Sequence, residues 1–129
     1  MILTDTSVLI EFARKPTLPV AQVVVSGKPA VCGVVVAELY TGLQTEAQRP
    51  DLDALLRLFG RVPIDEPVWK ITGRVMGAMT RRGTKIKFPD AVIAATAIHR
   101  KLPLWTRDAH FTWVQSAFPE LKLFDERAA

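Results

Sequence analysis

Apolar and polar positions divide the chain into short apolar runs and longer segments with helical periodicity. The short runs predict buried strands, because strands inside a parallel sheet are covered on both faces. Segments with apolar residues three and four positions apart predict helices that pack through one face. The expected strands are residues 1–5, 30–33, 61–64, 102–106 and 121–124, and the expected helices are residues 7–14, 20–26, 34–48, 50–59, 67–83 and 89–100.

Strands alternate with helices from one end of the chain to the other. This alternation is typical of an α/β fold, here a mostly parallel sheet of about five strands flanked by helices. Pro67 and Pro89 stand near the starts of two expected helices, and Gly83 ends the first of them. A chain of 129 residues without an internal repeat or a convincing linker is expected to form one domain, residues 1–129.

The composition is that of a globular protein, with 49% hydrophobic and 23% charged residues. No apolar stretch reaches the ~18 residues needed to cross a bilayer, and Asp5 interrupts any signal-peptide core. We therefore expect a cytoplasmic protein without a membrane partner. Cys32 is the only cysteine, so an internal disulfide is excluded, and its apolar surroundings predict a small buried side chain.

Four acidic residues stand where the chain is otherwise apolar: Asp5, Glu38, Asp90 and Asp108. A buried carboxylate is costly unless it is paired, protonated or bound to a cation, so a shared divalent metal is the simplest common explanation. Ligands of an open α/β sheet gather at the carboxyl ends of its strands. Asp5 ends the first expected strand and Asp108 follows the fourth, while the other two acids lie in the first turns of helices. Four separate elements can therefore bring their carboxylates to one place.

Each acid also has a structural interpretation of its own. Asp5 or Asp90 could only cap a helix, Glu38 could pair with an arginine, and Asp108 could cap a short helix that follows it. The joint pattern favours the metal site over four independent roles. Glu11 is expected on the solvated face of its helix. The remaining acids stand in polar stretches, where solvation accounts for them: Glu46, Asp51, Asp53, Asp65, Glu66, Glu120, Asp125 and Glu126.

Mg²⁺ or Mn²⁺ suits such a cluster, because both ions prefer oxygen ligands and retain bound waters. A divalent ion can activate a water, orient a phosphodiester and stabilise charge on the leaving oxygen. The net charge of +4 and the pI of about 9.6 leave a basic surface around an acidic pocket, which suits an anionic substrate. Together these features favour hydrolysis of a phosphodiester, with one metal ion or two.

The segments that carry the four acids resemble those of the PIN-domain nucleases, and more narrowly those of the VapC-type toxins of bacterial and archaeal toxin–antitoxin modules. They are residues 3–10, 36–43, 88–97 and 104–111, and they spread over nearly the whole chain. The resemblance implies a PIN fold and Mg²⁺- or Mn²⁺-dependent endoribonuclease activity. It also implies that the four acids form the metal-binding, catalytic quartet.

The resemblance extends to three hydroxyl side chains, and the chain departs from the family pattern at one pair of positions. Thr106, with the hydroxyl of Thr6 or Ser7, matches positions that hold the acids or metal-bound waters in place. Many relatives carry Asn at position 108 and an acid at position 110, whereas this chain has Asp108 first and His110 second. We assign the fourth carboxylate to Asp108. His110 could contact RNA, but packing or exposure is favoured for it.

A basic run just before Asp90 is a candidate contact for RNA phosphates, although a solvated helix end accounts for it equally well. The tryptophans could stack on bases, but packing in the core or at an interface is favoured for each of them. The candidate phosphate contacts are Arg81, Arg82, Lys85, Lys87 and Arg107, and the tryptophans are Trp69, Trp105 and Trp113.

The resemblance further implies a toxin of a type II toxin–antitoxin system, held inactive by a cognate VapB-type antitoxin, and a homodimer. The antitoxin's C-terminal segment would cross the helical groove and could place a basic side chain in the acidic pocket. Apolar faces at residues 20–24 and 52–59 are candidate partner surfaces, unless the core uses them fully. Two alternatives stay open: a PIN-type RNA-processing nuclease without an antitoxin, and a non-catalytic PIN module that binds RNA or protein.

Overall fold

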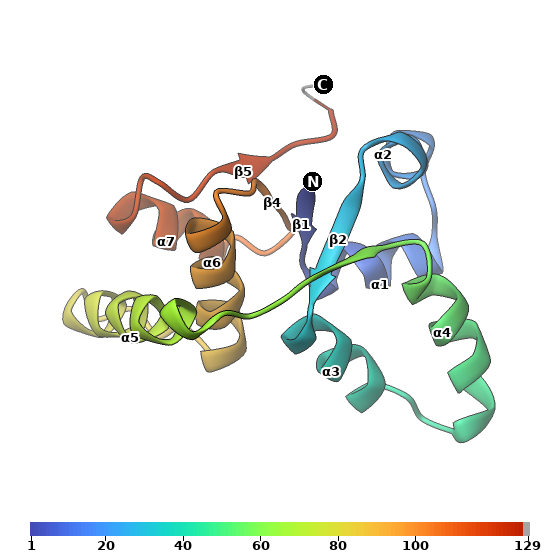
Figure 1. The fold of residues 1–129 in the computed structure, drawn as a ribbon, viewed down its shortest axis with the longest axis horizontal. Helices are drawn as coiled ribbons and strands as arrows, with labels where there is room; N and C mark the ends of the chain where they lie inside the picture. The colour runs from blue at the N-terminus through green and yellow to red at the C-terminus, as the bar shows by residue number, and fades with distance from the viewer. Residues whose placement is uncertain (128–129) are drawn as a thin grey trace.

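The computed structural model describes residues 1–127, which form one parallel sheet flanked by helices (Figure 1). Its five strands are β1 (Ile2–Thr4), β2 (Pro29–Cys32), β3 (Gly60–Val62), β4 (Leu104–Trp105) and β5 (Leu123–Phe124). They lie in the order β3-β2-β1-β4-β5, and every neighbouring pair is parallel. The α/β fold that the sequence indicates is therefore confirmed.

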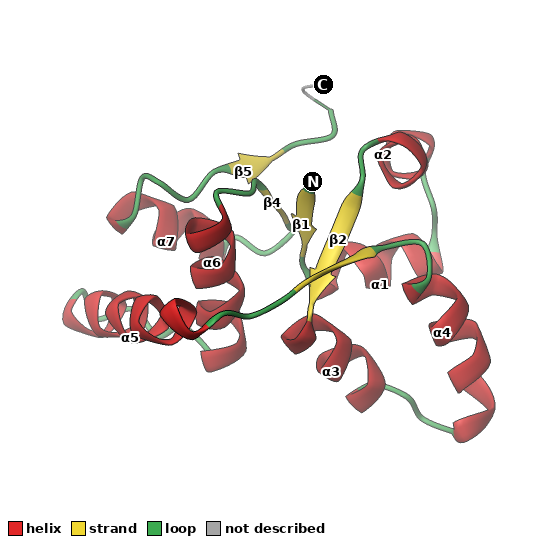
Figure 2. Cartoon of the chain, viewed as in Figure 1, coloured by secondary structure: helices red, strands yellow, loops and turns green. Residues whose placement is uncertain are grey.

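Seven α-helices and one 3₁₀-helix connect the strands within the described residues (Figure 2). Strand β1 is followed by α1 (Thr6–Arg14) and α2 (Leu18–Ser26), and β2 by α3 (Gly33–Thr41), η1 (Glu46–Gln48) and α4 (Arg49–Leu56). Helices α5 (Glu66–Arg81) and α6 (Phe88–Arg100) connect β3 to β4, and α7 (His110–Ala117) connects β4 to β5. None of these helices combines the length and the apolarity that a membrane crossing requires.

Strand β1 lies in the middle of the sheet, where the connections turn in opposite directions. The chain passes from β1 to β2 and β3 on one side, and it returns to β4 and β5 on the other. Leu3 lies opposite Ala30 of β2 and opposite Leu104 of β4. Ligand sites of open α/β sheets lie at such a topological switch point, outside the carboxyl ends of the strands. The fold therefore favours a site where β1 and β4 end.

Helix α6 is buried along most of its length and packs against α5. Its seven consecutive buried residues run from Ala91 to Ala97, and the alanines among them let neighbouring elements approach closely. The one buried hydroxyl of this stretch is satisfied, because Thr96 Oγ1 donates to the Val92 carbonyl at 2.7 Å. Tight packing of α6 on several sides fixes the position of its first turn, which carries Asp90.

Helix α3 ends earlier than the sequence pattern predicts. The helix expected at residues 34–48 stops at Thr41, and Gly42 follows the last helical residue. Beyond it, the side-chain oxygen of Gln48 accepts a hydrogen bond of 2.9 Å from the backbone N–H of Gln44. A side chain therefore satisfies a backbone donor that a continuous helix would have used.

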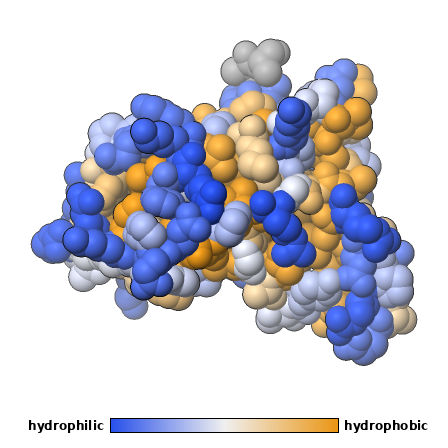
Figure 3. All heavy atoms as spheres, viewed as in Figure 1, coloured by the Kyte–Doolittle hydropathy of each residue, from blue (hydrophilic) through white to orange (hydrophobic). Residues whose placement is uncertain are grey.

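The apolar faces at residues 20–24 and 52–59 are largely used in the core. Helix α4 is shorter than the helix expected at residues 50–59. Phe59 packs from the turn that follows it, whereas Leu58 is exposed. The buried side chains of these faces include Val20, Leu52, Leu56 and Phe59. Leu18 and Val25 on α2 stay exposed, and Figure 3 shows apolar atoms at the surface beside α2.

Candidate metal centre

Four carboxylates converge beyond the carboxyl ends of β1 and β4. Asp5 follows β1 directly, Asp108 lies in the loop after β4, Asp90 is in the first turn of α6, and Glu38 is in α3. The negative charges of Asp5, Asp108 and Glu38 all reach the Asp90 carboxyl group and contribute to a raised pKa there. Each of the four acids comes from a different element. Of the four, only Asp90 and Asp108 belong to a group of described residues whose ligand atoms lie within 4.8 Å of one another, while the charges of Asp5 and Glu38 act on Asp90.

Asp5 is deeply buried, with 5% of the residue exposed. Its Oδ2 accepts hydrogen bonds from Ser7 Oγ (2.7 Å) and Thr106 Oγ1 (2.8 Å). Its side chain makes no capping bond to α1, and no ion pair within residues 1–127 involves it. A carboxylate that is buried without a positive partner favours an external cation as the missing charge.

Glu38 is held by a hydroxyl group from the first residue of helix α1. Thr6 Oγ1 donates to Glu38 Oε1 at 2.8 Å and so links α1 to α3. No arginine forms an ion pair with Glu38 in the part of the chain that the structure describes. Glu38 also lines a surface pocket of about 420 Å³ between α3 and the start of α6, together with Phe88 and Pro89.

Asp108 and His110 form a pair that adjoins Asp90. Asp108 Oδ1 accepts a hydrogen bond from the backbone N–H of His110 (2.9 Å) and lies 3.0 Å from His110 Nδ1. Thr106 Oγ1 accepts a further bond from the backbone N–H of Asp108 at 3.0 Å. One ligand atom from each of Asp90, Asp108 and His110 lies within 4.8 Å of the others, close enough to hold one metal ion. The sequence favoured packing or exposure for His110 and did not predict this pair, because the residue type alone does not show that the ring turns back toward Asp108.

Asp90 is half-buried, and its acidity is strongly perturbed. Burial, followed by the charges of Asp5, Asp108 and Glu38, raises its pKa from 3.8 to about 6, while His110 acts in the opposite direction. A bound divalent cation relieves this kind of repulsion between carboxylates. Carboxylate oxygens are donors that divalent cations accept, so the acids present fit a metal ion.

The sequence model of the PIN domain matches residues 2–115 of this chain. The chain belongs to the PIN-domain family. It is 32% identical over 126 residues to Ribonuclease VapC1 of Methanocaldococcus jannaschii, an alignment that covers 97% of this chain and 88% of that protein.

The chain is also similar to solved structures of other proteins. FitAcB from Neisseria gonorrhoeae is 28% identical, covers the whole of both chains and has a TM-score of 0.77. VapBC2 from Rickettsia felis, bound to a DNA fragment from its promoter, has a TM-score of 0.81 over 96% of this chain and 98% of that one. At 20% identity, the second likeness is one of fold.

Arg107 is engaged inside this PIN domain, which argues against the expected contact with RNA. Its guanidinium donates to Glu11 Oε2 (Nη2, 2.8 Å) and to Glu126 Oε2 (Nη1, 3.1 Å). Trp105 Nε1 donates to the same oxygen of Glu126 at 2.9 Å, and only 4% of the Glu126 side chain is exposed. The expectation that solvation accounts for Glu126 is therefore wrong, whereas the Glu11 side chain is 42% exposed, in keeping with the solvated face expected for it. No sequence signal joins position 107 to either acid.

The basic run of the PIN domain lies at the end of α5 and in the turn before α6. Its members, all exposed, are Arg81, Arg82, Lys85 and Lys87. Among the described residues, no hydrogen bond or ion pair joins this run to the four acids. Arg82 Nη1 donates to Ser116 Oγ of α7 at 3.1 Å. Of the tryptophans, Trp105 is fully buried in the core, whereas Trp69 and Trp113 are exposed.

Proposed function

We propose that this PIN domain is a Mg²⁺- or Mn²⁺-dependent endoribonuclease that acts as the toxin of a type II toxin–antitoxin system in the cytoplasm. The observation that carries the proposal is the group of carboxylates beyond the carboxyl ends of β1 and β4. Asp90 feels the charges of the other three, and buried Asp5 forms no ion pair within residues 1–127. The relative of 32% identity is named as a ribonuclease, which supports RNA as the substrate. Mg²⁺ and Mn²⁺ match the preference of this donor set for hard cations.

The proposed metal ligands are Asp5, Glu38, Asp90 and Asp108. A bound ion would offset their charges, lower the pKa of a bound water and stabilise charge on the leaving oxygen of the phosphodiester. The hydroxyl groups of Thr6, Ser7 and Thr106 hold Glu38 and Asp5 in fixed orientations. His110 holds Asp108 from the outside, as residues behind a metal ligand commonly do.

The proposed partner is a VapB-type antitoxin, and the active form is proposed to be a homodimer. One solved structure that is similar to this chain, at 24% identity and a TM-score of 0.67, is a toxin–antitoxin complex from Klebsiella pneumoniae. A toxin needs an inhibitor that covers its site. The pocket beside Glu38 offers an apolar wall for such a segment, and the four acids offer a binding point for a basic side chain.

The direct test is cleavage of RNA by the purified protein in the presence of Mg²⁺. We expect Asp5→Asn and Asp90→Asn to lower the rate by about a hundredfold or more while leaving the fold intact, because each removes a charge that holds the ion. Asp51→Asn is the matched control, since Asp51 is exposed in the first turn of α4 and makes no hydrogen bond or ion pair with the four acids among the described residues. Cleavage at the wild-type rate by either site variant would show that the assignment is wrong.

The toxin part of the proposal is tested in cells. Brief induction of the wild-type protein should arrest growth and create new RNA ends, whereas induction of Asp5→Asn should do neither. New RNA ends without growth arrest would favour the RNA-processing alternative over the toxin.

A further inference from the structure

Trp113 is an aromatic side chain that the fold leaves in solvent next to the metal centre. It is 46% exposed, although the protein buries Trp105 and Phe111 completely. Its indole ring contacts the imidazole of His110, with the ring centroids 4.7 Å apart and the planes at 59°. Because His110 lies against Asp108, Trp113 is one side chain away from the carboxylates.

A positive side chain lies on the other side of Trp113. Ser116 follows Trp113 by about one helical turn, and its Oγ both donates to the Trp113 carbonyl (2.6 Å) and accepts a hydrogen bond from Arg82 Nη1 (3.1 Å). His110, Trp113 and Ser116 are spaced three apart, so they share one face of α7. Along that face, in order of increasing separation from the acids, lie the His110 imidazole, the exposed Trp113 indole and Ser116, which binds the guanidinium of Arg82.

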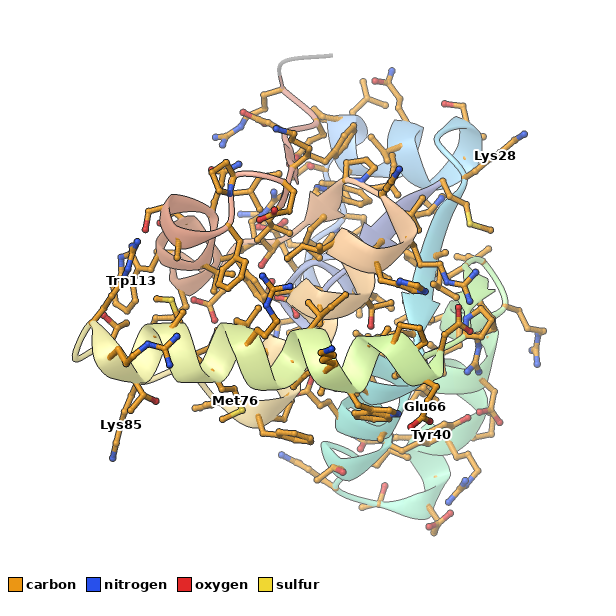
Figure 4. All side chains as sticks on the ribbon, turned by 60° about the vertical axis from the view of Figure 1, so that its left-hand side comes forward. Lys28, Tyr40, Glu66, Met76, Lys85 and Trp113 are labelled. Atoms are coloured by element: carbon orange, nitrogen blue, oxygen red, sulfur yellow. The ribbon has the colours of Figure 1, made fainter. Side chains whose placement is uncertain are left out.

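Arg82 is not neutralised by an acid among residues 1–127, and the exposed Arg81 and Lys85 lie close to it in sequence. Figure 4 shows Trp113 and Lys85 at the same end of α5, opposite the end that carries Glu66. Positive charge and an exposed aromatic ring are the two features that proteins use to bind unpaired nucleic acid: phosphates meet the cations, and bases stack on the ring.

We propose that Trp113 and Arg82 form a binding subsite for one nucleotide of single-stranded RNA, adjacent to the phosphate that is cleaved. The base stacks on the free side of the Trp113 indole, and Arg82 contacts a neighbouring phosphate. His110 fixes the ring from the opposite side and sets the distance between this subsite and Asp108. The proposal rests on the ribonuclease function proposed above. It also makes the enzyme selective for unpaired RNA, because bases inside a duplex are not free to stack on a side chain.

The test measures kcat and KM on a single-stranded oligoribonucleotide for Trp113→Leu, Trp113→Phe and Arg82→Gln. Loss of stacking should raise KM about tenfold with kcat changed less than about twofold, since the base contact stabilises the bound substrate and the transition state alike. Trp113→Phe should retain most of the affinity, because it keeps an aromatic face. Arg82→Gln should raise KM and weaken its dependence on salt concentration.

Trp69→Leu is the matched control. Trp69 is 45% exposed, almost the same as Trp113, but it lies in the first turn of α5. Thirteen residues of helix at 1.5 Å each place it about 20 Å from Arg82 along the axis. The KM of the Trp69→Leu variant should equal that of the wild-type protein. Thermal melting of each variant shows whether the fold is retained.

Several results would overturn the subsite. One is a wild-type KM for Trp113→Leu and Arg82→Gln in correctly folded protein. Another is an equal loss in Trp69→Leu, which would indicate a non-specific effect of removing surface tryptophans. A third is an unchanged KM with lost binding of a protein partner, which would make this face a protein-docking surface. If the wild-type protein binds the oligonucleotide without cleaving it, the proposed function fails and the Kd values of the same variants decide the subsite. If it does neither, both proposals fail.

Discussion

At the scale of single residues, the site depends on carboxylates in different surroundings. Asp5 is buried and held by two hydroxyl groups, whereas Asp90 is half-buried among three other negative charges. The hydroxyl groups fix the direction of Asp5, as the surroundings of metal ligands commonly do. Asp90 is instead repelled by the neighbouring negative charges. Its protonation state should therefore respond most to an added cation.

The raised pKa of Asp90 predicts that Asp90→Asn stabilises the metal-free protein at neutral pH. The pKa of Asp90 is about 6 in the folded protein and 3.8 ordinarily. The protonated group therefore contributes stability that is fully present below pH 3.8 and is lost as the pH rises through 6. A pKa shift of this size corresponds to about 3 kcal/mol in the free energy of unfolding, and the partial exposure of Asp90 reduces it. We therefore expect Asp90→Asn to raise the free energy of unfolding by about 1 kcal/mol at pH 7.5.

Urea denaturation of the metal-free protein at pH 7.5 and pH 4 measures this gain. The stabilisation should disappear at pH 4, where the wild-type Asp90 is already protonated, and Asp51→Asn should show no comparable gain. An Asp90→Asn protein that is less stable than the wild type at pH 7.5 would contradict the electrostatic description of the site.

At the scale of elements, a network of side chains ties the segment after β5 to the loop that carries Asp108. Arg107 bridges Glu11 of α1 and Glu126, and its backbone N–H donates to Ser7 Oγ at 3.0 Å. Ser7 in turn donates to Asp5. Hydrogen bonds therefore connect Glu126 to the metal centre through one arginine.

The network predicts that Glu126→Gln lowers the free energy of unfolding by about 2 kcal/mol at pH 7. Burial alone would raise the pKa of Glu126, but hydrogen bonds from Arg107 and Trp105 lower it to about 2. A depressed carboxyl pKa stabilises the fold above the ordinary value of 4.5, and this stability is lost as the pH falls through 2. Denaturant unfolding should show the loss at pH 7 and a smaller one at pH 3. Glu120→Gln is the control, since Glu120 is exposed, and equal stability of Glu126→Gln and the wild type at pH 7 would contradict the network.

The same elements show what the sequence could and could not predict. Buried strands such as β2 (Pro29–Cys32) carry continuous apolar runs, and the four acids stand out against them, so both were visible in the sequence. The end of α3 at Thr41 was not. Beyond it, the backbone N–H of Gln44 donates to the side-chain oxygen of Gln48, and the apolar pattern does not reveal this bond. The burial of Glu126 was not either, because its partners Arg107 and Trp105 meet it only in the folded sheet.

At the scale of the whole molecule, the site is a product of sheet topology. Asp5 and Asp108 are far apart in sequence, and they meet because β1 and β4 are neighbouring parallel strands at the switch point. Glu38 and Asp90 reach the same place from α3 and α6. The cluster therefore exists only in the folded chain, and cation binding should be coupled to folding.

Calorimetric titration of the purified, metal-free protein with Mn²⁺ tests the central claim most directly, because it reports the cation site without depending on the RNA substrate. Our proposal predicts saturable binding to the wild-type protein and to Asp51→Asn, and loss of that binding in Asp5→Asn and Asp90→Asn with the fold retained. No binding to the wild-type protein, or unchanged binding to Asp5→Asn and Asp90→Asn, would contradict it.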